Sequence, residues 1–202
     1  MYDQSQGHGF LIENFIRENV FKLKPIKNDT SKFDIQTCNE NISIKTTGSK
    51  TLCMGSILSF FDYDFNYNIT LIVIQYIQCD KLKIIKKIYE MNFCKECFEM
   101  LFENLNRYDV ENYVQYIKSI PHGKVDKDIK KKYKDMKKVL ESKSNCKITI
   151  NPKVDSKNQR RVQCSIQNFE TILEKYTFYE SQDTLRHVKL PKTINSDKRL
   201  RH

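Results

Sequence analysis

Residues 33–45, FDIQTCNENISIK, contain the pattern that decides the predicted fold. Phe33-Asp34-Ile35 and Ile42-Ser43-Ile44-Lys45 each alternate apolar and polar side chains, as half-buried strands do. Between them, Cys38-Asn39-Glu40-Asn41 has the composition of a turn. The stretch therefore predicts a β-hairpin with short strands over residues 32–36 and 42–46.

The segments on either side of this hairpin complete a predicted α/β core. Residues 10–23 place apolar side chains at helical spacing, and Pro25 ends the expected helix. Residues 69–78 are apolar on both faces, which is typical of a central strand, and residues 83–91 predict one more strand.

Helices dominate the second half of the chain. We expect them over residues 93–105, from an Asp109 cap to about residue 120, and over residues 126–141, with a short one at 168–175. Residues 147–154 and 160–166 predict a second hairpin. The fold class is thus α/β (α+β): a mixed central sheet flanked by helices, with a helical segment and a second β-hairpin in the C-terminal half.

This organisation predicts a single domain over residues 1–190. Its catalytic core would span about 9–92 and its helical, DNA-reading part about 93–190. Residues 191–202 are expected to form a loose basic tail.

Composition points to a basic intracellular protein. The 202 residues carry a formal net charge of +10, which favours a polyanionic partner, nucleic acid before an anionic membrane. Seven cysteines, a polar start and no long apolar run predict reduced thiols in the cytoplasm, with no secretion and no membrane span.

The first hairpin also carries the candidate chemistry. Side chains alternate along a strand, so Ser43 and Lys45 share one face and Asp34 can lie near it. A carboxylate, a second oxygen ligand and a lysine would then converge at a strand end. Such a site can hold Mg²⁺ and use the lysine to orient or deprotonate an attacking water.

This arrangement resembles the PD-(D/E)XK nuclease superfamily, which includes many type II restriction endonucleases. The resemblance covers about residues 9–78. It implies a restriction-endonuclease-like fold in which Asp34 binds the metal and Lys45 is catalytic. Ser43 stands where the family has an acidic residue, so a second carboxylate is expected from Glu13 on the first helix or, as second choice, Glu40. Gln75 matches a polar residue on the strand after the lysine, where it would position water or a ligand.

The second predicted hairpin is the candidate DNA-reading element. Val162, Cys164 and Ile166 alternate with polar residues, so one face would pack on the domain and the other would meet DNA. Arginine and amide side chains suit base edges, and lysines suit phosphates. The expected contacts come from Lys153, Ser156, Lys157, Asn158, Gln159, Arg160, Arg161, Gln163 and Ser165.

Two other patterns carry less weight. Cys94 and Cys97 have a CxxC spacing, but no second ligand pair follows, and both fall on the apolar side of a predicted helix. No G-x-x-x-x-G-K-[ST] loop is present, so we expect no nucleotide cofactor.

The sequence therefore predicts a Mg²⁺-dependent endodeoxyribonuclease, with Mn²⁺ able to substitute, that acts on double-stranded DNA as a homodimer. Three alternatives stay open: an inactive DNA-binding protein of the same fold, a structure-specific repair or recombination nuclease, and an RNA-binding or host-interaction protein. The last alternative expects Asp34 and Lys45 to lie far apart. An ordinary cross-strand ion pair between these two residues is the simplest rival explanation of the motif.

Overall fold

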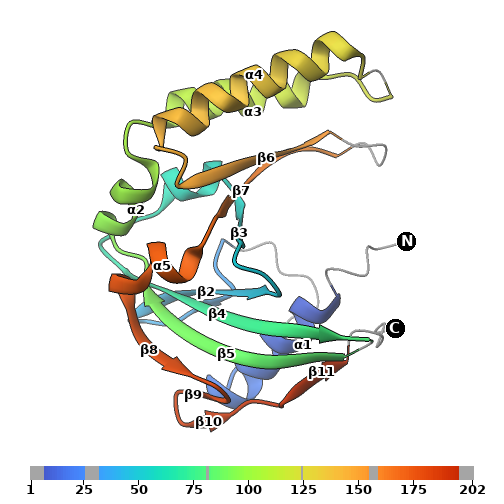
Figure 1. The fold of residues 1–202 in the computed structure, drawn as a ribbon. Coiled ribbons are helices and arrows are strands. Elements are labelled where there is room, and N and C mark those ends of the chain that lie inside the picture. Colours follow the sequence, from blue (N-terminus) through green and yellow to red (C-terminus); the bar gives the residue numbers. More distant parts are fainter. Residues whose placement is uncertain (1–6, 26–31, 81, 124, 155–158, 196–202) are drawn as a thin grey trace. The chain divides into compact units, whose positions relative to one another are not determined.

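The computed structural model describes residues 7–25, 32–80, 82–123, 125–154 and 159–195 (Figure 1). The chain divides into two compact units. The first unit comprises Met1–Lys50, Asn66–Phe93 and Leu173–His202, and the second comprises Thr51–Phe65 and Cys94–Ile172. Both units combine helices and strands, so the protein is α+β in the general sense that the sequence predicts.

A six-stranded mixed sheet forms the frame of the first unit. Its strands run in the order β1 (Ile35–Gln36), β2 (Glu40–Thr47), β4 (Asn68–Cys79), β5 (Leu82–Asn92) and β11 (Thr193–Asn195), and β8 (Thr177–Ser181) also pairs with β5. Strands β2 and β4 are parallel, whereas the other pairs are antiparallel. The predicted hairpin is confirmed, because Ile35 pairs with Ile42 and Gln36 with Asn41.

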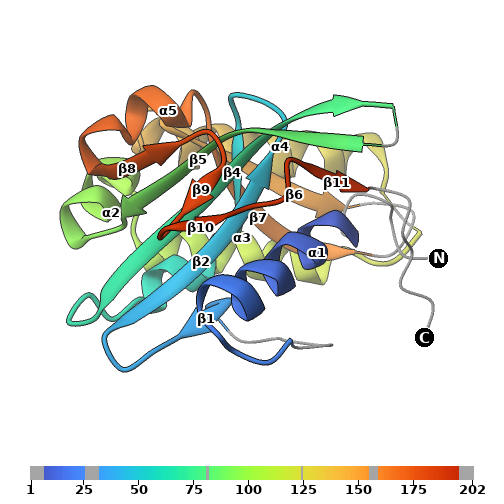
Figure 2. The same ribbon diagram turned by 90° about the horizontal axis from the view of Figure 1, so that it is seen from below.

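One face of this sheet is covered by the N-terminal helix (Figure 2). Helix α1 (Gly7–Phe15) continues into a π-helical turn, η1 (Ile16–Val20), and its buried Ile12 and Ile16 pack against Ile42 and Ile44 of β2. The π-helical turn ends at Val20, three residues before residue 23, where the sequence predicted the end of the helix. The wide turn that ends it is closed by the Phe21 N–H, which donates to the Ile16 carbonyl at 3.1 Å.

The second unit packs helices with a three-stranded sheet. The sheet has the order β3 (Leu52–Ser56), β7 (Arg160–Ile166), β6 (Ile148–Val154), so the predicted second hairpin is confirmed. The helices are η2 (Leu58–Asp62), α2 (Lys95–Phe102), α3 (Arg107–Ser119), α4 (Lys127–Lys143) and α5 (Phe169–Ile172). No helix in the described part of the chain is long and apolar enough to cross a membrane.

Several details differ from the sequence prediction. Helix α3 is capped by Asn106, whose side chain accepts from the Asp109 N–H at 2.9 Å, so Asp109 lies inside the helix. The expected helix at 168–175 is split into α5 and the 3₁₀ turn η3 (Glu174–Tyr176). The tail expected to be loose contains β11, in which Ile194 is buried against β5. Strands β3, β8, β9 (Thr184–Leu185) and β10 (Val188–Lys189) were not predicted either.

A buried lysine lies at the end of the first unit's sheet. Lys83 on β5 is only 6% exposed, and its amine lies 4.1 Å from the centre of the Tyr76 ring and donates to the Tyr76 hydroxyl at 3.0 Å. Burial lowers the pKa of Lys83 to about 8. Between this value and the ordinary 10.5, the unfolded chain binds more protons than the folded one, so folding stability rises with pH across that window.

We expect Lys83→Met to remove this pH dependence. The free energy of unfolding of the unaltered protein should rise relative to that of the variant by about 1 kcal/mol or more between pH 7.5 and 10, since one pKa unit corresponds to about 1.4 kcal/mol. Urea denaturation at both pH values measures the difference. Lys86→Met, at an exposed position of the same strand, is the control and should show no such trend. If the free energies of unfolding of Lys83→Met and of the unaltered protein differ by the same amount at both pH values, Lys83 is not a buried amine that titrates in this range.

Candidate functional site

Asp34 lies directly opposite Ser43 when the β1–β2 register is extended by one residue. The Ser43 hydroxyl donates to Oδ2 of Asp34 at 3.2 Å, and Ser43 itself is buried. The main chain of Asp34 is fixed from the helix side, because the Arg17 guanidinium of η1 donates to its carbonyl oxygen. The acid at position 34 is therefore held in place by both its backbone and its side chain.

The Asp34 carboxylate also replaces a strand partner for β2. Strand β1 contains only two residues, and Oδ2 of Asp34 accepts the Ile44 N–H at 2.6 Å. The N–H and C=O groups of one strand residue point to the same edge. The Ile44 carbonyl therefore faces the same open edge of the sheet as the Asp34 carboxylate.

Lys45 brings a cation to these oxygens. Its amine lies 3.5 Å from Oδ2 of Asp34 and donates to the Ile44 carbonyl at 3.2 Å. The side chains of Lys45 and Asp34 are 23% and 29% exposed, so the pair borders solvent without being freely hydrated. The structure thus brings Asp34, Ser43 and Lys45 together, which is not the separation expected for an RNA-binding or host-interaction protein without this site.

The donor atoms at this edge fit a hard divalent cation. Two oxygens, Oδ2 of Asp34 and the Ile44 carbonyl, already converge on the cationic amine of Lys45. Oδ1 of Asp34 has no hydrogen-bond partner among the described residues. Mg²⁺ prefers oxygen ligands, is often bound by one or two carboxylates, and keeps several waters. No group of three His, Cys, Asp or Glu side chains suited to a metal occurs in the described ranges, so a site here would depend on the main-chain carbonyl.

The two candidates for a second carboxylate are placed differently. Glu13 is half-buried on α1, next to Ile12, and this helix covers the Ile42–Ile44 face of β2, opposite the face of Ser43 and Lys45. A contact with Asp34 would have to pass around the edge left open by β1. Glu40 also shares the face of Ile42, and it is paired with Arg186.

Gln75 lies on β4 on the same face as Lys45. It pairs with Thr47, two residues beyond Lys45 on β2, and paired residues of neighbouring strands share a face. Its side chain is half-buried. Ser43, Lys45 and Gln75 therefore line one face of two adjacent parallel strands.

The second hairpin presents only part of the predicted DNA-reading set. Arg161 is exposed and Gln163 and Lys153 are partly exposed, while Val162, Cys164 and Ile166 are buried as predicted. Gln159 is partly exposed, and Ser156, Lys157 and Asn158 lie outside the described residues.

Two residues of this set have structural partners instead. The Arg160 guanidinium donates to the carbonyls of Ile120 and Pro121 at 2.9 Å each, and so fastens β7 to the end of α3. Ser165 is 5% exposed, and its hydroxyl accepts from Asn151 at 2.9 Å. Ser165 is therefore not exposed in the way that the predicted DNA-reading face requires: it lies on the central strand of its sheet, between Cys53 of β3 and Thr149 of β6.

The two cysteines of the CxxC pattern lie at the start of α2. Cys97 is fully buried, in agreement with an apolar position, and Cys94 is half-buried. Burial raises the pKa of the Cys94 thiol, which keeps it protonated at neutral pH.

Sequence reasoning missed a cluster around Arg186. Its guanidinium pairs with both carboxylate oxygens of Glu40, at 2.5 and 2.9 Å, and with Oε2 of Glu90 at 2.8 Å. Arg186 and His187 form the tight β9–β10 turn with φ of +48° and +68°, values that non-glycine residues rarely adopt. The hydrogen bonds from Arg186 lower the pKa of Glu40. No glycine or asparagine marks this turn, so no local signal indicated it.

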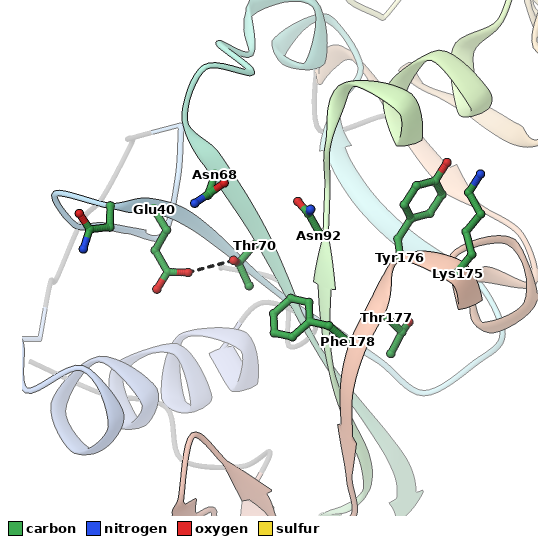
Figure 3. Close-up of a pocket in the computed structure, with 9 residues that line it drawn as sticks. Glu40, Asn68, Thr70, Asn92, Lys175, Tyr176, Thr177 and Phe178 are labelled. Atoms are coloured by element: carbon green, nitrogen blue, oxygen red, sulfur yellow. Dashed lines mark hydrogen bonds between the residues drawn. The ribbon is translucent and has the colours of Figure 1, made fainter.

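Glu40 also borders a pocket of about 570 Å³ in the first unit (Figure 3). The pocket lies where β2 and β4 begin and β5 ends. Glu40 accepts from the Thr70 hydroxyl at 2.9 Å on its wall. The lining residues are Asn39, Glu40, Asn68, Thr70, Asn92, Lys175, Tyr176, Thr177 and Phe178.

Arg186→Met should lower the free energy of unfolding at pH 7 by about 3 kcal/mol, because it leaves the buried Glu90 and the half-buried Glu40 without their cation. The lowered pKa of Glu40 contributes stability above its ordinary 4.5, and this contribution is lost as the pH falls through the folded-state pKa. The gap between variant and unaltered protein should therefore narrow between pH 7 and pH 4. Urea denaturation measures it, with the exposed Arg161→Met as control. A gap that widens in acid would contradict the pairing.

Comparison of the chain with known protein families, with curated proteins and with solved structures gave no match.

Proposed function

We propose that the protein is a Mg²⁺-dependent endodeoxyribonuclease, related in mechanism to the PD-(D/E)XK nucleases, with a restriction-endonuclease-like core. The observation that carries the proposal is the convergence of the Asp34 carboxylate, the Ile44 carbonyl and the Lys45 amine at one open sheet edge. The parallel β2–β4 pair, with Gln75 on the face of Lys45, supports it further. The net charge of +10 fits a DNA substrate.

Each residue has a defined task in this proposal. Asp34 and the Ile44 carbonyl would hold Mg²⁺, or Mn²⁺ in its place. Glu13, on the helix that covers the opposite face of β2, would have to reach around the edge left open by β1 to add a further ligand. Bound Mg²⁺ supplies Lewis-acid stabilisation of the charge that develops on the phosphate. Lys45 would orient or activate the attacking water beside the Asp34 carboxylate. Ser43 holds Oδ2 of Asp34 through its hydroxyl, and Gln75 positions water on the same face.

Cutting both strands of a duplex takes two such sites, which a two-fold dimer provides. We therefore propose a homodimer that acts in the cytoplasm on double-stranded DNA. Exposed Arg161 with Gln163 would contact base edges, and Lys153 a phosphate.

Asp34→Asn and Lys45→Met should each lower Mg²⁺-dependent cleavage of plasmid DNA at least 100-fold, since both remove a charge from the reacting centre. DNA binding measured in EDTA should change less than threefold. Lys50→Met, at an exposed lysine just beyond β2, is the control and should cleave normally. If the unaltered protein binds DNA and cuts none of it with Mg²⁺ or Mn²⁺, the catalytic proposal fails.

One observation favours a second function. Ser43 replaces the acidic residue of the family motif, and a serine is a weak metal ligand, so the fold could serve as an inactive DNA-binding protein. That protein would bind DNA equally well after either substitution, and the unaltered protein would not cleave DNA.

A structure-specific repair or recombination nuclease would instead cut only junctions or nicks. Comparison of cleavage of linear, nicked and branched substrates distinguishes this alternative.

Arg161→Ala should weaken binding to the preferred sequence by about 1–3 kcal/mol and relax the preference at one base, as expected for loss of a base contact. Lys153→Ala should weaken binding to all sequences alike. The plot of log binding constant against log salt concentration should become shallower by about one unit, which corresponds to one fewer released counterion. Fluorescence anisotropy with selected and random duplexes at several salt concentrations measures both. The buried Ser165→Ala is the control for the hairpin. If Arg161→Ala lowers the affinity for the selected and the random duplex equally, Arg161 contacts the DNA phosphates and not a base edge.

A further inference from the structure

The pocket beside Glu40 offers unused hydrogen-bonding groups. The side-chain amides of Asn39, Asn68 and Asn92 border it, are exposed, and make no hydrogen bond to any residue that the structure describes. An amide carries one acceptor oxygen and two donor hydrogens, so it can pair with a complementary flat edge. The pocket is thus equipped to recognise a ligand with both donors and acceptors.

An exposed aromatic ring lies at the same pocket. Phe178 is 60% exposed, and Figure 3 shows its ring extending from β8 toward Thr70. The β5–β8 register shifts here, with Glu90 opposite Tyr179 and Met91 opposite Thr177, so Phe178 is the additional residue of a β-bulge. Bulges re-aim side chains and are common beside functional sites. A large apolar ring aimed into a polar pocket has an unburied face on which a planar ligand can stack.

The charges around the pocket admit a phosphate. Arg186 neutralises Glu40, whose oxygens also accept the Thr70 hydroxyl. Lys175 is an exposed cation on the lining. A volume of about 570 Å³ lies within the roughly 300–1,000 Å³ typical of sites for small ligands.

We propose that this pocket binds a nucleobase with its phosphate: the base stacks on Phe178, its edge pairs with the amides of Asn68 and Asn92, and the phosphate meets Lys175. Unstacked bases are read in this way, by hydrogen bonds to the base edge and by aromatic stacking. This inference rests on the proposed function only for the choice of nucleic acid as partner, and it does not depend on cleavage of DNA by the protein. The base comes from an unpaired nucleotide of a strand or from a free nucleotide.

The test is equilibrium binding in EDTA, where no hydrolysis occurs. Fluorescence anisotropy of a labelled 12-nucleotide single strand, with unlabelled deoxyadenosine monophosphate as competitor, measures occupancy. Phe178→Ala should weaken binding of the strand about tenfold, as expected for loss of one base–aromatic contact. Asn92→Ala should weaken it severalfold, and Phe178→Tyr should retain it. Tyr108→Ala removes an exposed ring in the other unit and should leave the affinity unchanged.

The competitor identifies the source of the base. If the mononucleotide displaces the strand, the pocket binds free nucleotides. If the mononucleotide does not displace the strand, and Phe178→Ala still weakens binding of the strand, the pocket binds a base carried by a strand. The proposal is overturned if Phe178→Ala binds like Tyr108→Ala, or if neither probe binds the unaltered protein. Failure of the nuclease proposal gives a different result from failure of the pocket proposal. In that case the single strand still binds in EDTA, but the protein does not cleave duplex DNA in Mg²⁺.

Discussion

The hydrogen bond from the Ile44 N–H to the Asp34 carboxylate is the contact on which the candidate site depends. Because a side chain takes the place of a strand partner, β1 can stop after two residues while the backbone donor of β2 stays satisfied. The result is an edge at which the Ile44 carbonyl faces outward beside a carboxylate. Lys45 follows Ile44 in the chain, so its amine reaches both oxygens. A longer β1 would pair with this carbonyl and close the edge.

Arg186 performs a comparable function for the opposite face of the sheet. It joins the β9–β10 turn to β2 through Glu40 and to β5 through Glu90, and its guanidinium lies 4.8 Å from the centre of the Phe21 ring. The turn holds two residues in the left-handed region, which costs of order 1–3 kcal/mol each. Ion pairs to half-buried and buried carboxylates offset that cost and fix the strands that border the pocket.

Local pattern was enough to predict the elements whose periodicity is strong. The hairpin at residues 33–45, strands β4 and β5 and the β6–β7 hairpin bury apolar side chains at regular spacing, and all were predicted. Helix α4 was also predicted, although Leu140 is its only buried residue. The alternation along β2 also placed Ser43 and Lys45 on one face. What pattern could not supply was long-range pairing: β11 and β8 are short and owe their order to β5, far away in the chain. Ser165 appeared available for a similar reason: the sequence did not show that strand β3 pairs along β7, so that Ser165 lies between Cys53 of β3 and Thr149 of β6.

The same strand serves both candidate sites, and its geometry limits how they can act together. Glu40 and Lys45 are five residues apart on β2 and point to opposite faces. At about 3.3 Å per strand residue, roughly 16 Å separates them along the strand. A nucleotide whose phosphate is attacked beside Lys45 therefore cannot place its own base in the pocket beside Glu40. A base in that pocket must belong to another nucleotide, so the pocket would select or hold the nucleic acid without taking part in the hydrolysis itself.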